Sequence, residues 1–196
     1  TQIFWADSPE GPFLPFESKL PHTPMGQMCL DGTLWVENGT PYMIYCHEWV
    51  EMMDGTMELV ELKPDLSGTV GQPIRLFCAS AAEWSTGSLR EDGTRTYVTD
   101  GCFLYRTQTG KLLMIWSSFK NGEYAIGIAE SMTGKVFGPW KQQKEPLFDK
   151  HGGHGMIFKT FDGRLCVVLH APNSPGGAER AHIFEIEDLG HTLKLK

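Results

Sequence analysis

Residues 100–116, DGCFLYRTQTGKLLMIW, contain a pattern that occurs three times in this chain. A short polar signal is followed by an apolar run, a tight turn and a second apolar run. The same order occurs in residues 31–46 (DGTLWVENGTPYMIYC) and in residues 154–170 (HGMIFKTFDGRLCVVLH). Asp31 and Asp100 are 69 residues apart, and Asp100 and His154 are 54 residues apart. Self-similarity at such a period is typical of stacked or radial β units. It predicts that each unit carries a chemically functional side chain at the same structural position.

The composition is that of a globular domain. The chain has 196 residues, of which 41% are hydrophobic and 21% charged, so it can bury a core. The net charge of -7 argues against nucleic acid or an anionic membrane as the main partner. No apolar stretch approaches the length of a membrane span. The five cysteines contain no Cys-x-x-Cys pair, which predicts buried free thiols rather than a zinc site.

Strand signals dominate the chain, because β-rich runs lie between Gly, Pro, Asn and Asp, and long windows with helical spacing are missing. The polar residues 79–96 are long enough to form a functional loop. A second repeat, WADSPEGPF (5–13) and IAESMTGKVFGPW (128–140), predicts where one unit closes and the next begins. We therefore predict an all-β propeller, with the end of one blade in residues 1–20 and further blades in residues 27–78, 97–140 and 153–190. A complete β-sandwich is the alternative.

Four segments together resemble glycoside hydrolase family 43. They are CLDGTLWVENGTPYMIYCHEW (29–49), YVTDGCFLYRTQTGKLLMIWSS (97–118), YAIGIAESMTGKVFGPW (124–140) and GGHGMIFKTFDGRLCVVLHAPN (152–173). The resemblance implies a five-bladed β-propeller that acts on arabinose-, xylose- or galactose-containing plant polysaccharides. Three blades do not close a ring. We therefore expect the N-terminal blades, or a second chain, to complete the domain.

The resemblance also implies site residues. Family members are inverting hydrolases with three carboxylates, and by motif Asp31 would tune the pKa of the acid while Asp100 would be the general acid. The general base would come from the first blade, which this chain does not contain. Asp100 stands where the family usually has Glu, and Cys102 stands where it usually has Pro. The reserve candidates for the acid are Glu48, Glu83 and Glu91.

A plain turn is the alternative interpretation of each Asp-Gly pair, as expected for Asp162-Gly163 and Asp92-Gly93. The catalytic interpretation therefore depends on geometry. It requires that Asp31 and Asp100 converge on one cavity, near the shared axis on which His154 would also lie.

Other side chains are candidates for binding sugar or metal. Glu48 and Trp49 follow an apolar strand and suit a sugar subsite, although a capped strand with a packing Trp is equally consistent. Trp84 could stack on a sugar face, and Arg180 could clamp hydroxyl groups or be a surface residue. His154 matches a family histidine near a bound calcium, so a calcium site held largely by water is predicted there.

Two functions follow. The first is a hydrolase of arabinose- or xylose-containing polysaccharides, and the second is a propeller or fragment that binds glycans without cleaving them. The sequence does not fix the sugar, the linkage or the compartment. The resemblance favours a secreted or periplasmic protein, whereas unpaired thiols favour a reducing setting.

Overall fold

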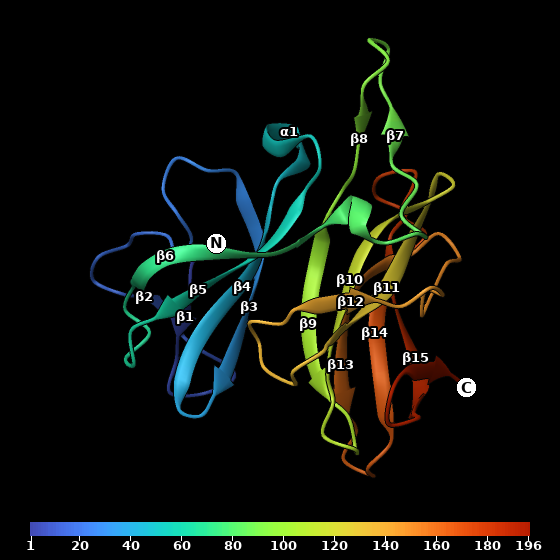
Figure 1. Ribbon diagram of the computed structural model, residues 1–196. Coiled ribbons are helices and arrows are strands. Elements are labelled where there is room, and N and C mark those ends of the chain that lie inside the picture. Colours follow the sequence, from blue (N-terminus) through green and yellow to red (C-terminus); the bar gives the residue numbers. More distant parts are fainter.

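Three four-stranded antiparallel sheets hold most of the chain, and the computed structural model describes all residues 1–196 (Figure 1). Sheet I consists of β3 (Cys29–Glu37), β4 (Thr40–His47), β5 (Thr56–Leu62) and β6 (Thr69–Cys78). Sheet II consists of β9 (Asp100–Arg106), β10 (Leu112–Lys120), β11 (Glu123–Ser131) and β12 (Trp140–Gln142). Sheet III consists of β13 (Gly153–Lys159), β14 (Leu165–Ala171), β15 (Arg180–Asp188) and β16 (Leu193–Leu195).

The remaining elements are short. They are β1 (Phe4–Trp5), β2 (Leu14–Pro15), α1 (Trp49–Met52), the 3-10 turn η1 (Ala79–Ala81), β7 (Ser88–Leu89) and β8 (Arg95–Thr96). The predicted loop 79–96 therefore contains η1 and the β7–β8 hairpin, which projects beyond the sheets at the same end as α1 (Figure 1). No helix here has the length and apolarity needed to cross a membrane. The all-β architecture predicted from the sequence is confirmed, and it forms part of a β-propeller.

The hairpins form where the sequence places turn residues. β3 and β4 are joined through Asn38 and Gly39, whose φ angles of 52° and 82° are those that a two-residue hairpin turn requires. The turns at Gly110 and Gly163 also have positive φ. Each sheet is therefore a meander in which neighbouring strands pair in sequence order.

Sheet II is apolar on both faces because it lies between the other two sheets. Leu112, Met114 and Trp116 of β10 pack in the core shared with sheet I. The alternate residues Leu113 and Ile115 pack in the core shared with sheet III. Successive strand side chains point to opposite faces, so burial on both faces explains the unbroken run LLMIW in the sequence.

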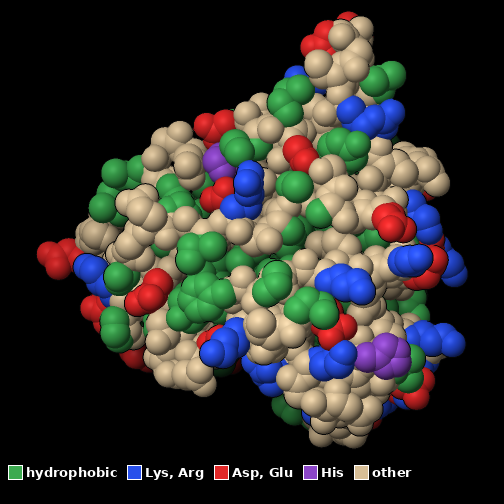
Figure 2. Space-filling view, in the orientation of Figure 1, with side chains coloured by type: hydrophobic (Ala, Val, Ile, Leu, Met, Phe, Trp, Pro, Cys, Tyr) green, Lys and Arg blue, Asp and Glu red, His purple; other side chains and the backbone are tan.

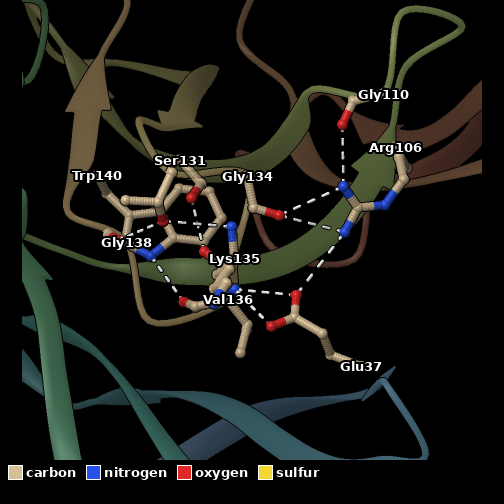
Figure 3. A network of polar contacts seen from close by, with 10 residues as sticks. Glu37, Arg106, Gly110, Ser131, Gly134, Lys135, Val136, Gly138 and Trp140 are labelled. Atoms are coloured by element: carbon tan, nitrogen blue, oxygen red, sulfur yellow. Dashed lines mark hydrogen bonds and ion pairs between the residues drawn. The ribbon is translucent and has the colours of Figure 1, made fainter.

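Polar contacts join sheets I and II at the end where β3 finishes (Figure 3). The Glu37 carboxylate accepts hydrogen bonds from Val136 N at 3.1 and 3.4 Å and lies 3.7 Å from Nη2 of Arg106. Arg106 also donates to the carbonyl oxygens of Gly110 and Gly134. We call these residues the Glu37 clamp, because they tie the end of β3 to the turn that precedes β12.

The outward faces of sheets I and III keep apolar side chains at the surface. On sheet I these include Leu34, Val36 and Val70, and on sheet III they include Met156 and Ile183. In the space-filling view, apolar side chains come to the surface among charged ones on the side formed by sheet I (Figure 2). All five cysteines are free, and Cys46, Cys102 and Cys166 are buried, as the sequence predicts.

Candidate active site

A β-bulge near the start of the first strand of each sheet shapes the site. The pairing register shifts between Leu30 and Thr33 on β3, opposite Ile115 and Ser117 on β10, and between Gly153 and Met156 on β13. Within these bulges one residue has left-handed φ: Asp31 at 56°, Gly101 at 52° and His154 at 54°. A bulge bends its strand and re-aims a side chain, which suits a site built on a shared axis.

The bulges correct the alignment expected from the sequence. Asp31 is equivalent to Gly101 and His154, whereas Asp100 pairs with Ser117 and lies one residue before the bulge position. The prediction that Asp31, Asp100 and His154 occupy the same structural position is therefore wrong by one residue for Asp100. Aligning the two Asp-Gly pairs residue by residue does not reveal this offset, because the position of a bulge cannot be identified from the sequence.

The three bulges nevertheless meet. Gly101 N donates a hydrogen bond to Oδ2 of Asp31 at 3.1 Å, and the Cys102 thiol donates to the Asp31 carbonyl oxygen at 3.3 Å. Nε2 of His154 lies 3.8 Å from Oδ1 of Asp31, and His154 N donates to Oγ of Ser117 at 2.8 Å. A Cβ atom on Gly101 would lie 2.8 Å from Cγ of His154, so only glycine allows this approach.

Asp100 directly precedes Gly101 in the chain and is half-buried. Its Oδ2 accepts a hydrogen bond from the Tyr124 hydroxyl at 2.8 Å. Burial, the largest cause, and the charge of Asp31 raise the pKa of Asp100, while the Tyr124 hydrogen bond and the nearby His154 and His170 act in the opposite direction. Burial and the adjacent Asp100 also raise the pKa of Tyr124, so its hydroxyl remains a donor.

Glu48 follows the end of β4 and joins the same group of acids. The residue is 9% exposed, and its backbone N–H donates to the Met28 carbonyl oxygen at 2.8 Å. Its carboxylate does not cap α1 and has no hydrogen-bond donor in the structure. Burial, then the charges of Asp100 and Asp31, raise the pKa of Glu48. The other two reserve candidates, Glu83 and Glu91, are exposed. Asp31 lines the cavity described next, whereas Asp100 and the three reserve candidates do not.

A cavity of about 460 Å³ opens beside the bulges. Its ionisable lining consists of Asp31, Cys102, His154, His170, Glu179 and Arg180, with Met156 and Val168 among its apolar lining. Its volume lies in the range of small-ligand sites. Nη1 of Arg180 donates to the carbonyl oxygens of Gly177 and Glu179, so the guanidinium is fixed beside the cavity and keeps further N–H groups.

The structure places the predicted sugar-stacking tryptophans differently. Trp84 is 4% exposed and packs against Trp116, with ring centroids 4.9 Å apart. Gly127 makes room for its ring, since a Cβ atom there would lie 2.1 Å from Trp84. The prediction that Trp84 contacts sugar is therefore wrong, because its indole fills the core between sheets I and II. Trp49 is half-buried, and the Arg90 guanidinium lies 5.6 Å from its ring centroid.

The donor set does not fit the predicted calcium site at His154. No group of three His, Cys, Asp or Glu side chains is arranged to hold a metal. Calcium prefers six to eight oxygen ligands, and the closest acidic oxygen to His154 Nε2 is that of Asp31.

Sequence reasoning missed the residues that support the acids. Tyr124 holds Asp100, Ser117 holds the backbone of His154, and His170 stacks on Tyr124 with ring centroids 5.5 Å apart. The available signal was chemical, because a tyrosine inside a buried strand needs a partner for its hydroxyl. Its partner lies in another strand, so the sequence did not reveal which acid it binds.

Comparisons with known proteins agree with this architecture. Residues 1–186 match the family described as glycosyl hydrolases family 43. The chain is 44% identical to an endo-arabinase from Bacteroides thetaiotaomicron VPI-5482, with a TM-score of 0.87 over 95% of this chain and 65% of that one. It is 25% identical to a thermostable family-43 glycoside hydrolase, with a TM-score of 0.83 over 100% of this chain and 65% of that one.

An endo-1,4-β-xylanase from the same Bacteroides strain shares the fold at 20% identity, with a TM-score of 0.77 over 97% of this chain. The chain spans 65% of the length of each of these three proteins. No curated protein sequence matches the chain. The resemblance inferred from the four sequence segments is thereby confirmed.

Proposed function

Because this chain belongs to glycosyl hydrolase family 43, we propose that it carries the axial part of an active site that hydrolyses arabinose- or xylose-containing plant polysaccharides. The observation that carries the proposal is the meeting of Asp31 and His154 with the backbone of Gly101, next to Asp100. Three separate sheets contribute these groups beside one cavity. The 44% identity to an endo-arabinase supports an arabinose polymer as the first substrate to test.

We propose an inverting reaction. A water molecule attacks the anomeric carbon from one face and gives its proton to a general base, while a carboxylic acid on the other face protonates the departing glycosidic oxygen. The bond from the anomeric carbon to that oxygen breaks as the new bond to water forms. The base would come from outside the 196 residues, since the family places it in the first blade.

Within this chain Asp31 is the carboxylate neighbour of the acid. Its Oδ2 accepts a hydrogen bond from Gly101 N, and its Oδ1 lies 3.8 Å from Nε2 of His154. A charged neighbour raises the pKa of the acid, which must keep its proton near neutral pH. Asp100, at the family position, is the candidate for supplying that proton, and Glu48 is the reserve candidate. Arg180, fixed at the cavity, would bind sugar hydroxyls.

The direct test uses the natural protein that contains this sequence, at its full length. We expect it to release sugar from arabinan, arabinoxylan or aryl pentosides, with the first product in the inverted anomeric configuration by proton NMR. An absence of turnover on every pentoside and galactoside would refute the hydrolase proposal. Retained binding in affinity electrophoresis would then favour the non-catalytic glycan-binding alternative.

A further inference from the structure

Tyr124 of β11 is buried at the acidic end of the sheets, and its hydroxyl is the side-chain partner of the Asp100 carboxyl group. Tyr124 is 2% exposed, and its hydroxyl donates to Oδ2 of Asp100 at 2.8 Å. The other carboxyl oxygen, Oδ1, makes no hydrogen bond and keeps contact with solvent. The next residue, Gly101, lines the cavity. The hydrogen bond therefore holds Oδ2 and leaves Oδ1 as the oxygen that a substrate can reach.

The Tyr124 ring is held against the first two strands of sheet III. The His170 imidazole of β14 stacks on it, with centroids 5.5 Å apart and planes inclined by 20°. A Cβ atom on Gly153 of β13 would lie 2.3 Å from Cε1 of the tyrosine, so a larger residue there would displace the ring. Gly153 pairs with His170, so both contacts belong to one place in sheet III. They explain the glycine directly before His154, which the sequence pattern alone does not.

His170 connects this support to the cavity. Its side chain lines the cavity, and its Nε2 lies 2.9 Å from Oδ1 of Asn173, which holds the imidazole in place. The same imidazole stacks on the tyrosine that binds Asp100, and stacked rings stabilise a fixed relative orientation. A continuous set of contacts therefore runs from the cavity wall through Tyr124 to the carboxyl group of Asp100.

We propose that Tyr124 is a positioning residue, whose hydroxyl holds Oδ2 of Asp100 so that Oδ1 carries the proton for the departing sugar oxygen, with His170 as its support. This inference rests on the proposed hydrolase function. In a neutral carboxyl group the carbonyl oxygen is the better hydrogen-bond acceptor, so Oδ2 takes that role and the proton resides on Oδ1. The Oδ1–H bond breaks as the glycosidic oxygen takes the proton. Its electron pair stays on Asp100, and solvent returns a proton after product release.

Several ionisable groups lie near Asp100 and act on the same proton. Those on the other elements are Asp31 of β3, Cys46 of β4, Glu48 after β4, His154 of β13 and His170 of β14. Replacing Tyr124 by Phe changes none of these groups, and the tyrosine itself carries no charge, because burial raises the pKa of its hydroxyl. The substitution removes only the hydrogen bond, so a change in pH dependence reports on that contact.

Tyr124→Phe tests the proposal, since it keeps the ring and its stack and removes the hydroxyl. In the full-length protein we expect kcat for phenyl pentosides to fall on the order of 10-fold with KM unchanged, because the acid loses its fixed orientation. A hydrogen bond donated to a carboxylate lowers its pKa, and the basic limb of kcat/KM reports loss of the proton from the acid. This limb should therefore move to higher pH by about one unit.

Tyr105→Phe is the matched control. The Tyr105 hydroxyl donates to Oδ2 of Asp188 at 3.0 Å, and Tyr105 lies near the end of β9 opposite to Asp100. The variant loses the same kind of hydrogen bond, and it should keep the kcat and the pH profile of the unmodified protein. Equal changes in the two variants would refute the proposal, because Tyr124 would then act only on the fold.

The direction of the shift separates two roles of Asp100. If Asp100 is instead a charged neighbour of another acid, loss of the Tyr124 hydrogen bond weakens that charge and the basic limb moves to lower pH. That result, or an unchanged limb, would overturn the proposal while the protein remains a hydrolase. An absence of activity in the unmodified protein refutes the proposed function itself, and this inference with it.

Two substitutions at His170 test the support without removing the hydroxyl. His170→Phe and His170→Ala both remove the imidazole, but only Phe keeps an aromatic face against Tyr124. We therefore expect kcat to fall several-fold further in His170→Ala than in His170→Phe. Equal kcat values would show that the stack does not position Tyr124. Because Tyr124 is intact in both variants, this comparison tests the proposal even if Tyr124→Phe does not fold.

Discussion

Charged side chains have opposite surroundings at the two ends of β3 and β9. Where β3 finishes, the Glu37 carboxylate faces the N–H of Val136 and the guanidinium of Arg106 (Figure 3). Where β3 and β9 begin, Asp31 lies among other acids and in a left-handed backbone conformation. The same two strands thus carry a well-paired end and an end where like charges collect.

This difference separates stability from chemistry. The Glu37 clamp satisfies a backbone donor and joins two sheets, which stabilises the fold. The acidic end stores electrostatic repulsion and backbone strain, which a structure retains where they serve a reaction. Changes at the acidic end should therefore reduce activity more than stability, and changes at the clamp should do the reverse.

Asp31→Asn gives the largest expected effect on activity. It removes the charge that favours a protonated acid while keeping the shape of the side chain, so kcat/KM should fall on the order of 10²–10⁴-fold. Circular dichroism should remain unchanged. Asp162→Asn is the matched control, because Asp162 precedes Gly163 in an exposed turn and pairs with Arg164. Equal losses for the two variants would show that Asp31 has no special role.

Gly101→Ala tests the convergence of the bulges. The new Cβ would meet the His154 ring at a backbone φ of 52°, so we expect a loss of about 3 kcal/mol in the free energy of unfolding, from strain and overpacking together. Gly110→Ala has φ of 84° with no atom within 4 Å, and it should lose about 1 kcal/mol. Urea denaturation measures both. Similar losses would mean that β9 and β13 are not tightly packed at Gly101.

Much of the fold could be predicted from the sequence because its causes are local. The turn residues Asn38 and Gly39 specify a hairpin, and the continuous apolar run in β10 indicates a strand buried on both faces. The meander order then follows, since sequential strands joined by tight turns pair with each other. These features need no knowledge of distant contacts.

The site could be predicted only in part, because its arrangement depends on contacts between sheets. Asp31 and His154 were found from the repeat, but the offset of Asp100 depends on a bulge. Trp84 was misplaced, because its burial requires the space left by Gly127 in another strand. The role of Tyr124 likewise depends on a hydrogen bond across sheet II to Asp100.

Glu37→Ala tests the paired end. It leaves the N–H of the buried Val136 without its acceptor, so the free energy of unfolding should fall by about 1–2 kcal/mol while kcat/KM stays unchanged. Lys111→Ala breaks an exposed ion pair with Glu130, and it should change stability by less than about 0.5 kcal/mol. A loss of activity in Glu37→Ala that exceeds its loss of folded protein would contradict the separation of the two ends.

The smallest effect concerns the stability of the acidic end itself. Because the pKa of Glu48 is raised in the folded protein, the folded state binds this proton more tightly than the unfolded state, and stability falls as pH rises from the unfolded value of about 4.3 through the folded one. Glu48→Gln lacks this loss. Its melting temperature should exceed that of the unmodified protein at pH 8, and the difference should narrow as the pH falls toward 4. Scanning fluorimetry at both pH values measures the difference in melting temperature, with Glu61→Gln, at an exposed position of β5, as the control. If the difference is the same at pH 4 and pH 8, Glu48 has the same pKa in the folded protein as in the unfolded chain.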